Sequence, residues 1–470
     1  MNKKKLIHIT ISIFISALFS VFLANIILFF WQRSLNFKVS YFIIVVLFIS
    51  PVIYMIINKI PIWFPKVKST ILTNRIYFVL ICFIIPFWFF FIMPVFLNSG
   101  QSMEFINYIS RSNPIGADFK FDLNFSRSLI LNHEPTVNIY PPLSVVLFTP
   151  FAYLTPQTAY FFIILIDIIC IILISFILPK LINPKLNSEI AMLFFVSSFL
   201  AYGTHFEIER GQWNLIAVTL SIIAIYLFYN QPKLRIISFI LFSISIQLKL
   251  YPAIYIFLFW DQFDYWKNNI IRVVGLGLFN ILLLFCLGFD VFYTFYQNLS
   301  NVAANPYLFS LNHSTDSFVY YLKNDLNVTF FEPIQLKIIL LSTAFIFLFG
   351  IFITSYSGFK KINPILLLGC TIMAMILPSV SVDYKLIILT APVQYLLIQF
   401  PEWENKYSKQ LWSNIFLFII TIAYATTLYS SLNKPAIFGN NFLVLYIILF
   451  TATMLSVFLG INKKSLSKIP

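Results

Sequence analysis

The sequence predicts an all-α, polytopic membrane protein. Of its 470 residues, 60% are hydrophobic and 10% are charged. The mean hydropathy of +0.88 exceeds what a soluble domain needs to fill its core. Apolar runs long enough to cross about 30 Å of hydrocarbon recur along the whole chain. The chain, residues 1–470, is therefore expected to be a single membrane domain.

The apolar runs predict about 11–14 transmembrane helices. They lie near residues 6–31, 41–58, 76–97, 157–179, 190–203, 213–229, 236–248, 251–260, 273–289, 336–358, 364–378, 385–400, 412–430 and 441–460. The first run is too long for a signal peptide and lacks a small-residue cleavage site, so we interpret it as a retained helix. Lys249 and Pro252 divide one long apolar stretch, which favours half-helices or re-entrant pieces there.

The basic residues indicate the orientation of the chain. Alternating the spans from a cytoplasmic N-terminus puts most of the 31 Lys and Arg residues on the inside, as the positive-inside rule favours. The C-terminus is then cytoplasmic too. The net charge of +14 is scattered singly and in pairs between apolar segments, so it indicates topology and not nucleic-acid binding. We expect a multi-pass protein of the cell (inner) membrane, in contact with membrane lipids.

The same topology places two long loops outside the cell membrane, at 98–156 and 290–335, and short outer turns at 203–212 and 379–384. Loops of this length in a compact protein are usually functional, so we expect both to be structured.

The first long loop carries two carboxylates near the end of the third span, Asp118 and Asp122. Further along, Tyr140 precedes Pro141 and Pro142, which predict an extended entry into an amphipathic or re-entrant segment. A carboxylate at this depth is suited to general-base catalysis on a hydroxyl group. On residue type alone, an ordinary solvated loop aspartate is the simpler interpretation.

The turn after the fifth span is unusually polar. It contains His205, Glu207, Glu209, Arg210, Gln212 and Asn214. A merely connecting turn needs only one or two such side chains. Arg210 is suited to clamp a phosphate by paired hydrogen bonds, and Gly211 allows the backbone to approach a ligand. The alternative is that Glu and Arg neutralise each other at a helix end.

Polar residues of the later segments belong to the same outer side. Lys249, in QLKLYP, is expected either to reach the membrane surface or to pair with an anion. His313 and Asp316 form either a polar pair or an ordinary solvated loop sequence. Asp383 and Lys385 flank Tyr384 at an outer turn. A topology chosen from Lys and Arg thus brings these motifs to one membrane face.

At these residues the chain is similar to glycosyltransferase family 87, a group of GT-C membrane enzymes that use polyprenyl-phosphate-mannose. The matching pieces are GADF at 116–119, YPPL at 140–143, RGQWN at 210–214, KLYP at 249–252 and the Asp383 turn. The resemblance implies a GT-C-type helix bundle and inverting transfer of a hexose, mannose in this family. The donor would be a polyprenyl-phosphate-linked sugar and the acceptor a lipid or glycan, on the extracytoplasmic face.

The resemblance also implies that Asp118 is the catalytic base and that the GQxN turn and Lys249 help form the donor site. From the residues themselves we keep Asp122 as the reserve base. We expect the donor phosphate or the substrate to be bound by Tyr140, Glu207, Arg210, Gln212, Asn214, Lys249, Tyr251, His313, Asp383 and Lys385. Phosphate is a good leaving group when cations meet its charge, so no metal or cofactor is expected. Family members often have histidines directly after the late aspartate, where this chain has Tyr384 and Lys385, and His313 is a candidate replacement.

Two other functions are considered. A polysaccharide polymerase or ligase would use a lipid-linked oligosaccharide in place of a single sugar. A membrane transporter or lipid flippase would suit the many helices, the broken spans and Asp167, which lies within the fourth span. Its polar residues should line a path through the bilayer, however, and here they gather outside.

Overall fold

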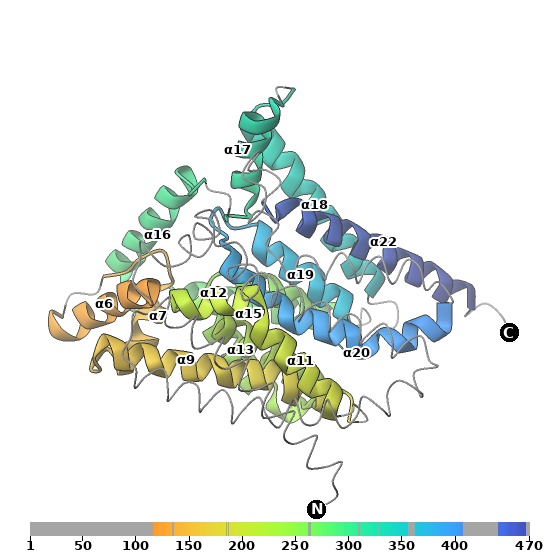
Figure 1. Cartoon of the computed structure of the whole chain (residues 1–470), viewed down its shortest axis with the longest axis horizontal. Helices are drawn as coiled ribbons and strands as arrows, with labels where there is room; N and C mark the ends of the chain where they lie inside the picture. The colour runs from red at the N-terminus through yellow and green to blue at the C-terminus, as the bar shows by residue number, and fades with distance from the viewer. Residues whose placement is uncertain are drawn as a thin grey trace, which may run out of the picture.

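In a computed structural model of the chain, the regular secondary structure of the described part is helical (Figure 1). The described residues are 116–133, 136–184, 186, 188–261, 265–308, 311–328, 330–355, 362–407 and 440–466. Within them the backbone forms no strand, and its one isolated β-bridge joins Asn312 to Val382. The predicted spans 6–31, 41–58, 76–97 and 412–430 lie outside the described residues.

The predicted spans from residue 157 onward that lie within the described residues coincide with helices. Those of the first half are α9 (Pro156–Ile172), η2 (Leu173–Ile177), α10 (Leu178–Ile182), α11 (Ser188–Leu200), α13 (Asn214–Asn230), α14 (Arg235–Leu248) and the 3-10 helix η4 (Tyr251–Phe259). Those of the second half are α15 (Trp266–Leu283), α18 (Pro333–Ser355), α19 (Pro364–Ile376), the 3-10 helix η6 (Asp383–Leu389), α20 (Thr390–Tyr407) and α22 (Phe442–Leu466).

Two helical stretches of the described part, Pro156–Ile182 and Pro333–Thr354, are long and apolar enough to cross a membrane. The segments Asn214–Asn230, Pro364–Ile376 and Phe442–Val457 are apolar but shorter. Large apolar side chains lie exposed on α15 and α18, including Ile271 and Ile346. Exposed apolar faces of this kind suit contact with lipid.

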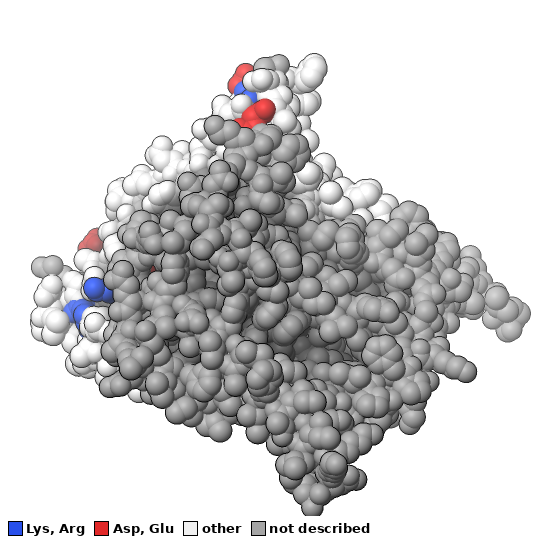
Figure 2. Space-filling view, in the orientation of Figure 1, with Lys and Arg blue, Asp and Glu red and all other residues white. Residues whose placement is uncertain are grey.

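The two predicted loops contain helices where they are described. The first holds α6 (Ala117–Leu131), α7 (Pro142–Leu147) and α8 (Thr149–Ala152), and the second holds α16 (Phe289–Ala304) and α17 (Thr315–Leu326). Figure 2 shows charged side chains of one face near α6 and at the α17 end of the molecule.

The core is centred on α19, every residue of which is buried. Helices α18, α20 and α22 lie around it (Figure 1), and η4 also packs against it. The chain divides between α14 and η4 at Lys249, whose backbone is extended, with φ −147° and ψ 137°. Pro252 explains the division because proline lacks an N–H group and disfavours helical geometry in the residue before it.

Three glycines allow neighbouring elements to approach closely. A Cβ atom on Gly203 of α12 (Tyr202–Arg210) would lie 2.6 Å from the backbone nitrogen of Ile387 in η6. Gly211, with φ +66°, ends α12, and its Cβ would lie 2.8 Å from that of Phe119 in α6. Gly116, with φ +71°, precedes α6 and faces the ring of Tyr160 in α9. The start of α6 and the end of α12 are thereby held together.

Candidate active site

A carboxylate and a guanidinium group meet where α6 begins and α12 ends. Arg210 donates from Nε to Asp118 Oδ2 at 3.1 Å and from Nη2 to Asp118 Oδ1 at 2.5 Å. Such a two-point pair is strong and fixes the plane of the carboxylate. The Asp118 and Arg210 side chains are 22% and 24% exposed, so the pair is accessible from outside.

Gln212 connects this carboxylate to a buried cation. Its Nε2 donates to Asp118 Oδ2 at 2.6 Å, while its Oε1 accepts from Lys249 Nζ, also at 2.6 Å. The two contacts fix the orientation of the amide, since its nitrogen can only donate and its oxygen can only accept. One glutamine therefore sets the separation between a possible base and a possible phosphate ligand.

Two aromatic rings surround the ammonium group of Lys249. Lys249 Nζ lies 4.0 Å from the ring centroid of Tyr140 and 4.7 Å from that of Trp213, close enough for cation–π attraction. The Trp213 indole donates to Leu248 O at 3.1 Å, which fixes the ring. Tyr140 also donates its hydroxyl to Gln212 Oε1 at 3.5 Å. In the described part of the chain Lys249 forms no ion pair with a carboxylate.

Glu207 binds the start of α13, whereas the sequence offered an arginine at the same helix end as its alternative partner. Its carboxylate accepts from the Asn214 side chain at 2.9 Å and from the Leu215 backbone N–H at 3.0 Å. It therefore caps the N-terminus of α13, where backbone N–H groups have no partner within the helix. Burial raises the pKa of the Glu207 carboxyl to about 7. Tyr251 donates its hydroxyl to Asn214 O at 2.8 Å and joins the same turn to η4.

Asp122 lies one helical turn after Asp118 but in a drier position. It is 8% exposed, and Oδ1 accepts a long, 3.5 Å hydrogen bond from Asn138. Burial is the largest influence and raises the pKa of the Asp122 carboxyl to about 7, while the charge of Lys249 opposes this shift. The two aspartates of α6 thus differ in solvent access and in hydrogen bonding.

The sequence model of glycosyltransferase family 87 matches residues 138–378, just over half of the chain. The chain belongs to glycosyltransferase family 87. No curated protein and no solved structure matches it. Membership makes it a membrane glycosyltransferase, a transferase with a sugar donor and an acceptor.

In this family 87 member, His313 and Asp383 contact each other. Nδ1 of His313 is 3.0 Å from Asp383 Oδ1, and both side chains are fully buried. Asn441 donates to the same carboxylate oxygen at 3.1 Å, and Ser381 Oγ lies 3.0 Å from His313 Nε2. Burial lowers the pKa of the His313 imidazole. A neutral ring that donates from Nδ1 to Asp383 and accepts from Ser381 satisfies all three groups.

Two of the three sequence interpretations of His313 were wrong, and its suggested replacement of the family histidines beside Asp383 stays a prediction. The expected partner Asp316 instead pairs with Lys337 of α18 at 2.6 Å, and the buried His313 is not a solvated loop residue. Long-range packing explains the difference, because the Asn312–Val382 bridge holds the second loop against the turn before η6. Neighbours in sequence were a poor guide to this contact.

The cluster of glycosyltransferase family 87 residues draws on segments far apart in the chain. Asp118, Tyr140, Arg210, Gln212 and Lys249 lie together, Glu207, Asn214 and Tyr251 support the turn beside them, and Lys385 lies near Tyr251. Two residues absent from the sequence prediction belong here. Trp213 contacts Lys249, and Tyr384 packs edge-on against Phe206 at a ring distance of 5.6 Å. Both could have been predicted from the sequence, because Trp213 lies within RGQWN and Tyr384 follows Asp383 directly.

Proposed function

We propose that this glycosyltransferase transfers a hexose, mannose by family resemblance, from a polyprenyl-phosphate-linked donor to a lipid or glycan acceptor. The reaction would take place on the extracytoplasmic face and invert the anomeric centre. One observation carries the proposal. Asp118 and Lys249 both bind Gln212, so an acceptor of protons and a phosphate-binding cation are held next to each other.

The proposed step is a single displacement. The oxygen of the acceptor hydroxyl forms a bond to the anomeric carbon while the bond from that carbon to the phosphate oxygen breaks. The phosphate leaves with the electron pair, and the proton of the hydroxyl passes to the Asp118 carboxylate. This is general-base catalysis combined with electrostatic stabilisation of the leaving group.

Asp118 suits the role of base because it is partly exposed and still has capacity to accept. A carboxylate offers about four lone-pair positions, and Arg210 and Gln212 supply three hydrogen bonds. A hydroxyl group can therefore approach the remaining position. Asp122 stays in reserve, since its carboxyl is buried behind the first turn of α6.

The cation nearest the leaving phosphate is proposed to be Lys249. Arg210 donates to Asp118 by two nitrogens, so we assign it first to orienting the base and second to the phosphate. The neighbouring cation is Lys385, whose Nζ donates to Val380 O at 3.1 Å and lies 5.6 Å from the Tyr251 ring centroid. Two ammonium groups would offset the charge of a phosphate at the membrane surface.

The donor class is tested with purified wild-type protein and a host lipid extract as acceptor source. The donors are polyprenyl-phosphate-mannose, polyprenyl-phosphate-glucose, a nucleotide-mannose and a pyrophosphate-linked oligosaccharide, and products are identified by mass spectrometry. We expect product from a polyprenyl-phosphate sugar alone. Product only from the oligosaccharide donor would establish the polymerase or ligase alternative and contradict the proposal.

A further inference from the structure

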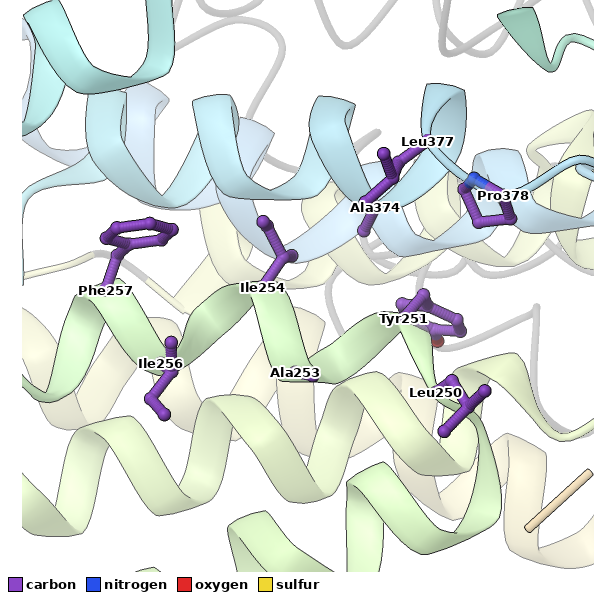
Figure 3. Close-up of a pocket in the computed structure, with 9 residues that line it drawn as sticks. All are labelled: Leu250, Tyr251, Ala253, Ile254, Ile256, Phe257, Ala374, Leu377 and Pro378. Carbon is purple, nitrogen blue, oxygen red and sulfur yellow. The ribbon is translucent and has the colours of Figure 1, made fainter. Parts of the chain in front are cut away.

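An apolar groove runs between η4 and α19 beside the candidate active site (Figure 3). Its volume is about 250 Å³, and its walls include Leu250, Tyr251, Ile254, Phe257, Ala374 and Leu377. Figure 3 shows Ile254 and Phe257 directed from η4 towards α19. A 3-10 helix rises about 2.0 Å per residue, so the wall from Leu250 to Phe257 is roughly 14 Å long. These dimensions suit a stretch of hydrocarbon chain.

Two cations stand at one end of this groove. Lys249 directly precedes Leu250, the first residue of the wall, and Lys385 Nζ lies 5.6 Å from the ring of Tyr251. Both lysine side chains are buried, and among the described residues neither forms an ion pair with an acid. Buried ammonium groups favour an anionic partner because the apolar surroundings do not solvate their charge.

The combination of an apolar groove with cations at one end matches an amphiphile with an anionic head. The position of the anionic head also fixes where the sugar and the hydrocarbon chain of such a ligand would lie. Lys249 donates to Gln212, and Gln212 donates to Asp118, so a phosphate on Lys249 would place its attached sugar beside the carboxylate. The hydrocarbon chain would then leave in the opposite direction, along η4.

We infer that the groove between η4 and α19 binds the first isoprenyl units of the donor's carrier lipid, with the phosphate at Lys249 and Lys385. This inference rests on the proposed function and adds to it the location and chemistry of the lipid-binding part. The occupant is a single-chain polyprenyl phosphate. A two-chain phospholipid would need a second apolar path from the same head position.

The test measures binding of undecaprenyl phosphate to purified protein in detergent. Ile254→Trp fills the groove from η4, and Leu377→Trp fills it from the end of α19. Loss of contact with about two CH₂ groups weakens binding by roughly tenfold, so we expect that change in Kd for both variants. Ile338→Trp is the matched control, because Ile338 is 58% exposed on α18 and does not line the groove.

Inorganic phosphate and phosphatidylglycerol serve as competitors. Inorganic phosphate occupies only the head of the site, so its affinity should change less than twofold in the two groove variants. Unchanged binding of undecaprenyl phosphate by both correctly folded variants would overturn the inference. Displacement of undecaprenyl phosphate by phosphatidylglycerol as effectively as by unlabelled undecaprenyl phosphate would overturn it too. Groove-dependent binding without any sugar transfer would support the lipid site while contradicting the proposed function.

Discussion

At the scale of single residues, the site depends on how one amide joins two opposite charges. Gln212 is 2% exposed and uses both ends of its side chain, one on Asp118 and one on Lys249. Removing it would leave the buried Lys249 ammonium with aromatic contacts but without this hydrogen bond. Hydrogen bonds to charged groups contribute about 1.5–3 kcal/mol each.

Gln212→Leu is expected to lower kcat/KM by roughly 10–100-fold, which is the kinetic equivalent of about 1.5–3 kcal/mol. Steady-state transfer from polyprenyl-phosphate-mannose measures this change. Gln394→Leu is a matched control, since Gln394 is also buried and hydrogen-bonded, to Ser198 at 2.6 Å, but lies outside the site. Equal losses of kcat/KM in both variants would indicate a general structural effect.

Asp122 should make stability depend on pH. Its pKa is about 7 in the folded protein and 3.8 ordinarily, so folding favours its protonated form. This stabilising contribution is complete below pH 4 and is lost as the pH rises through about 7. Asp122→Asn should therefore gain stability relative to wild type between pH 5 and pH 8, by up to about 4 kcal/mol.

Thermal unfolding of the two proteins in detergent at pH 5 and pH 8 measures that difference. Ser126→Ala on the same helix is the control, because Ser126 is buried and does not titrate. The Tm difference between Ser126→Ala and wild type should be the same at pH 5 and at pH 8. A pH-independent difference for Asp122→Asn would contradict the raised pKa.

At the scale of elements, the site depends on α12 lying directly against η6. Gly203 makes this contact possible, because any Cβ atom there would lie 2.6 Å from the Ile387 backbone nitrogen. Gly203→Ala should force the helices apart and reduce the free energy of unfolding by about 1–3 kcal/mol. Activity should fall as well, since the displaced α12 carries Arg210.

Gly275→Ala is the matched control for this substitution. Gly275 lies within α15, and a Cβ atom there would meet nothing within 4 Å. Alanine should stabilise that helix by about 0.5–1 kcal/mol. Chemical denaturation and transfer assays compare the two, and equal behaviour of the variants would contradict the proposed packing of α12 on η6.

The His313–Asp383 pair joins the second loop to η6, and Asn441 extends the connection to α22. We expect His313→Ala and Asp383→Ala each to destabilise the protein, because each leaves a buried polar partner unsatisfied. In the double variant the losses should not add, and the coupling should be about 1–3 kcal/mol. Additive losses in a double-mutant cycle would show that the pair contributes no direct interaction.

At the scale of the whole molecule, hydropathy predicted the positions of the apolar helices described after residue 157, because burial in lipid requires long apolar helical runs. It did not predict α12, α16 and α17, which lie in predicted turns and loops. The break at Lys249 was also predicted, since Pro252 disfavours a continuous helix. The family motifs predicted most members of the Asp118 cluster. These features depend on local sequence or on motifs that can be recognised directly.

The partners within the cluster could not be predicted in the same way. The Asp118–Arg210 pair spans 92 residues, and its formation depends on how Gly116 and Gly211 let α6 and α12 approach. His313 pairs with a residue 70 positions away, although Asp316 lies much closer along the chain. Side-chain partners across such separations are set by tertiary packing, which local patterns do not encode.

The most direct test of the account compares wild type with Asp118→Asn in transfer from polyprenyl-phosphate-mannose. Both proteins must be present at equal abundance, and Asp122→Asn is assayed alongside them. We predict that Asp118→Asn loses at least about 100-fold in kcat, within the usual contribution of a general base, while still binding undecaprenyl phosphate. Wild-type transfer rates in Asp118→Asn would contradict the central claim, and a selective loss in Asp122→Asn would move the base to that residue.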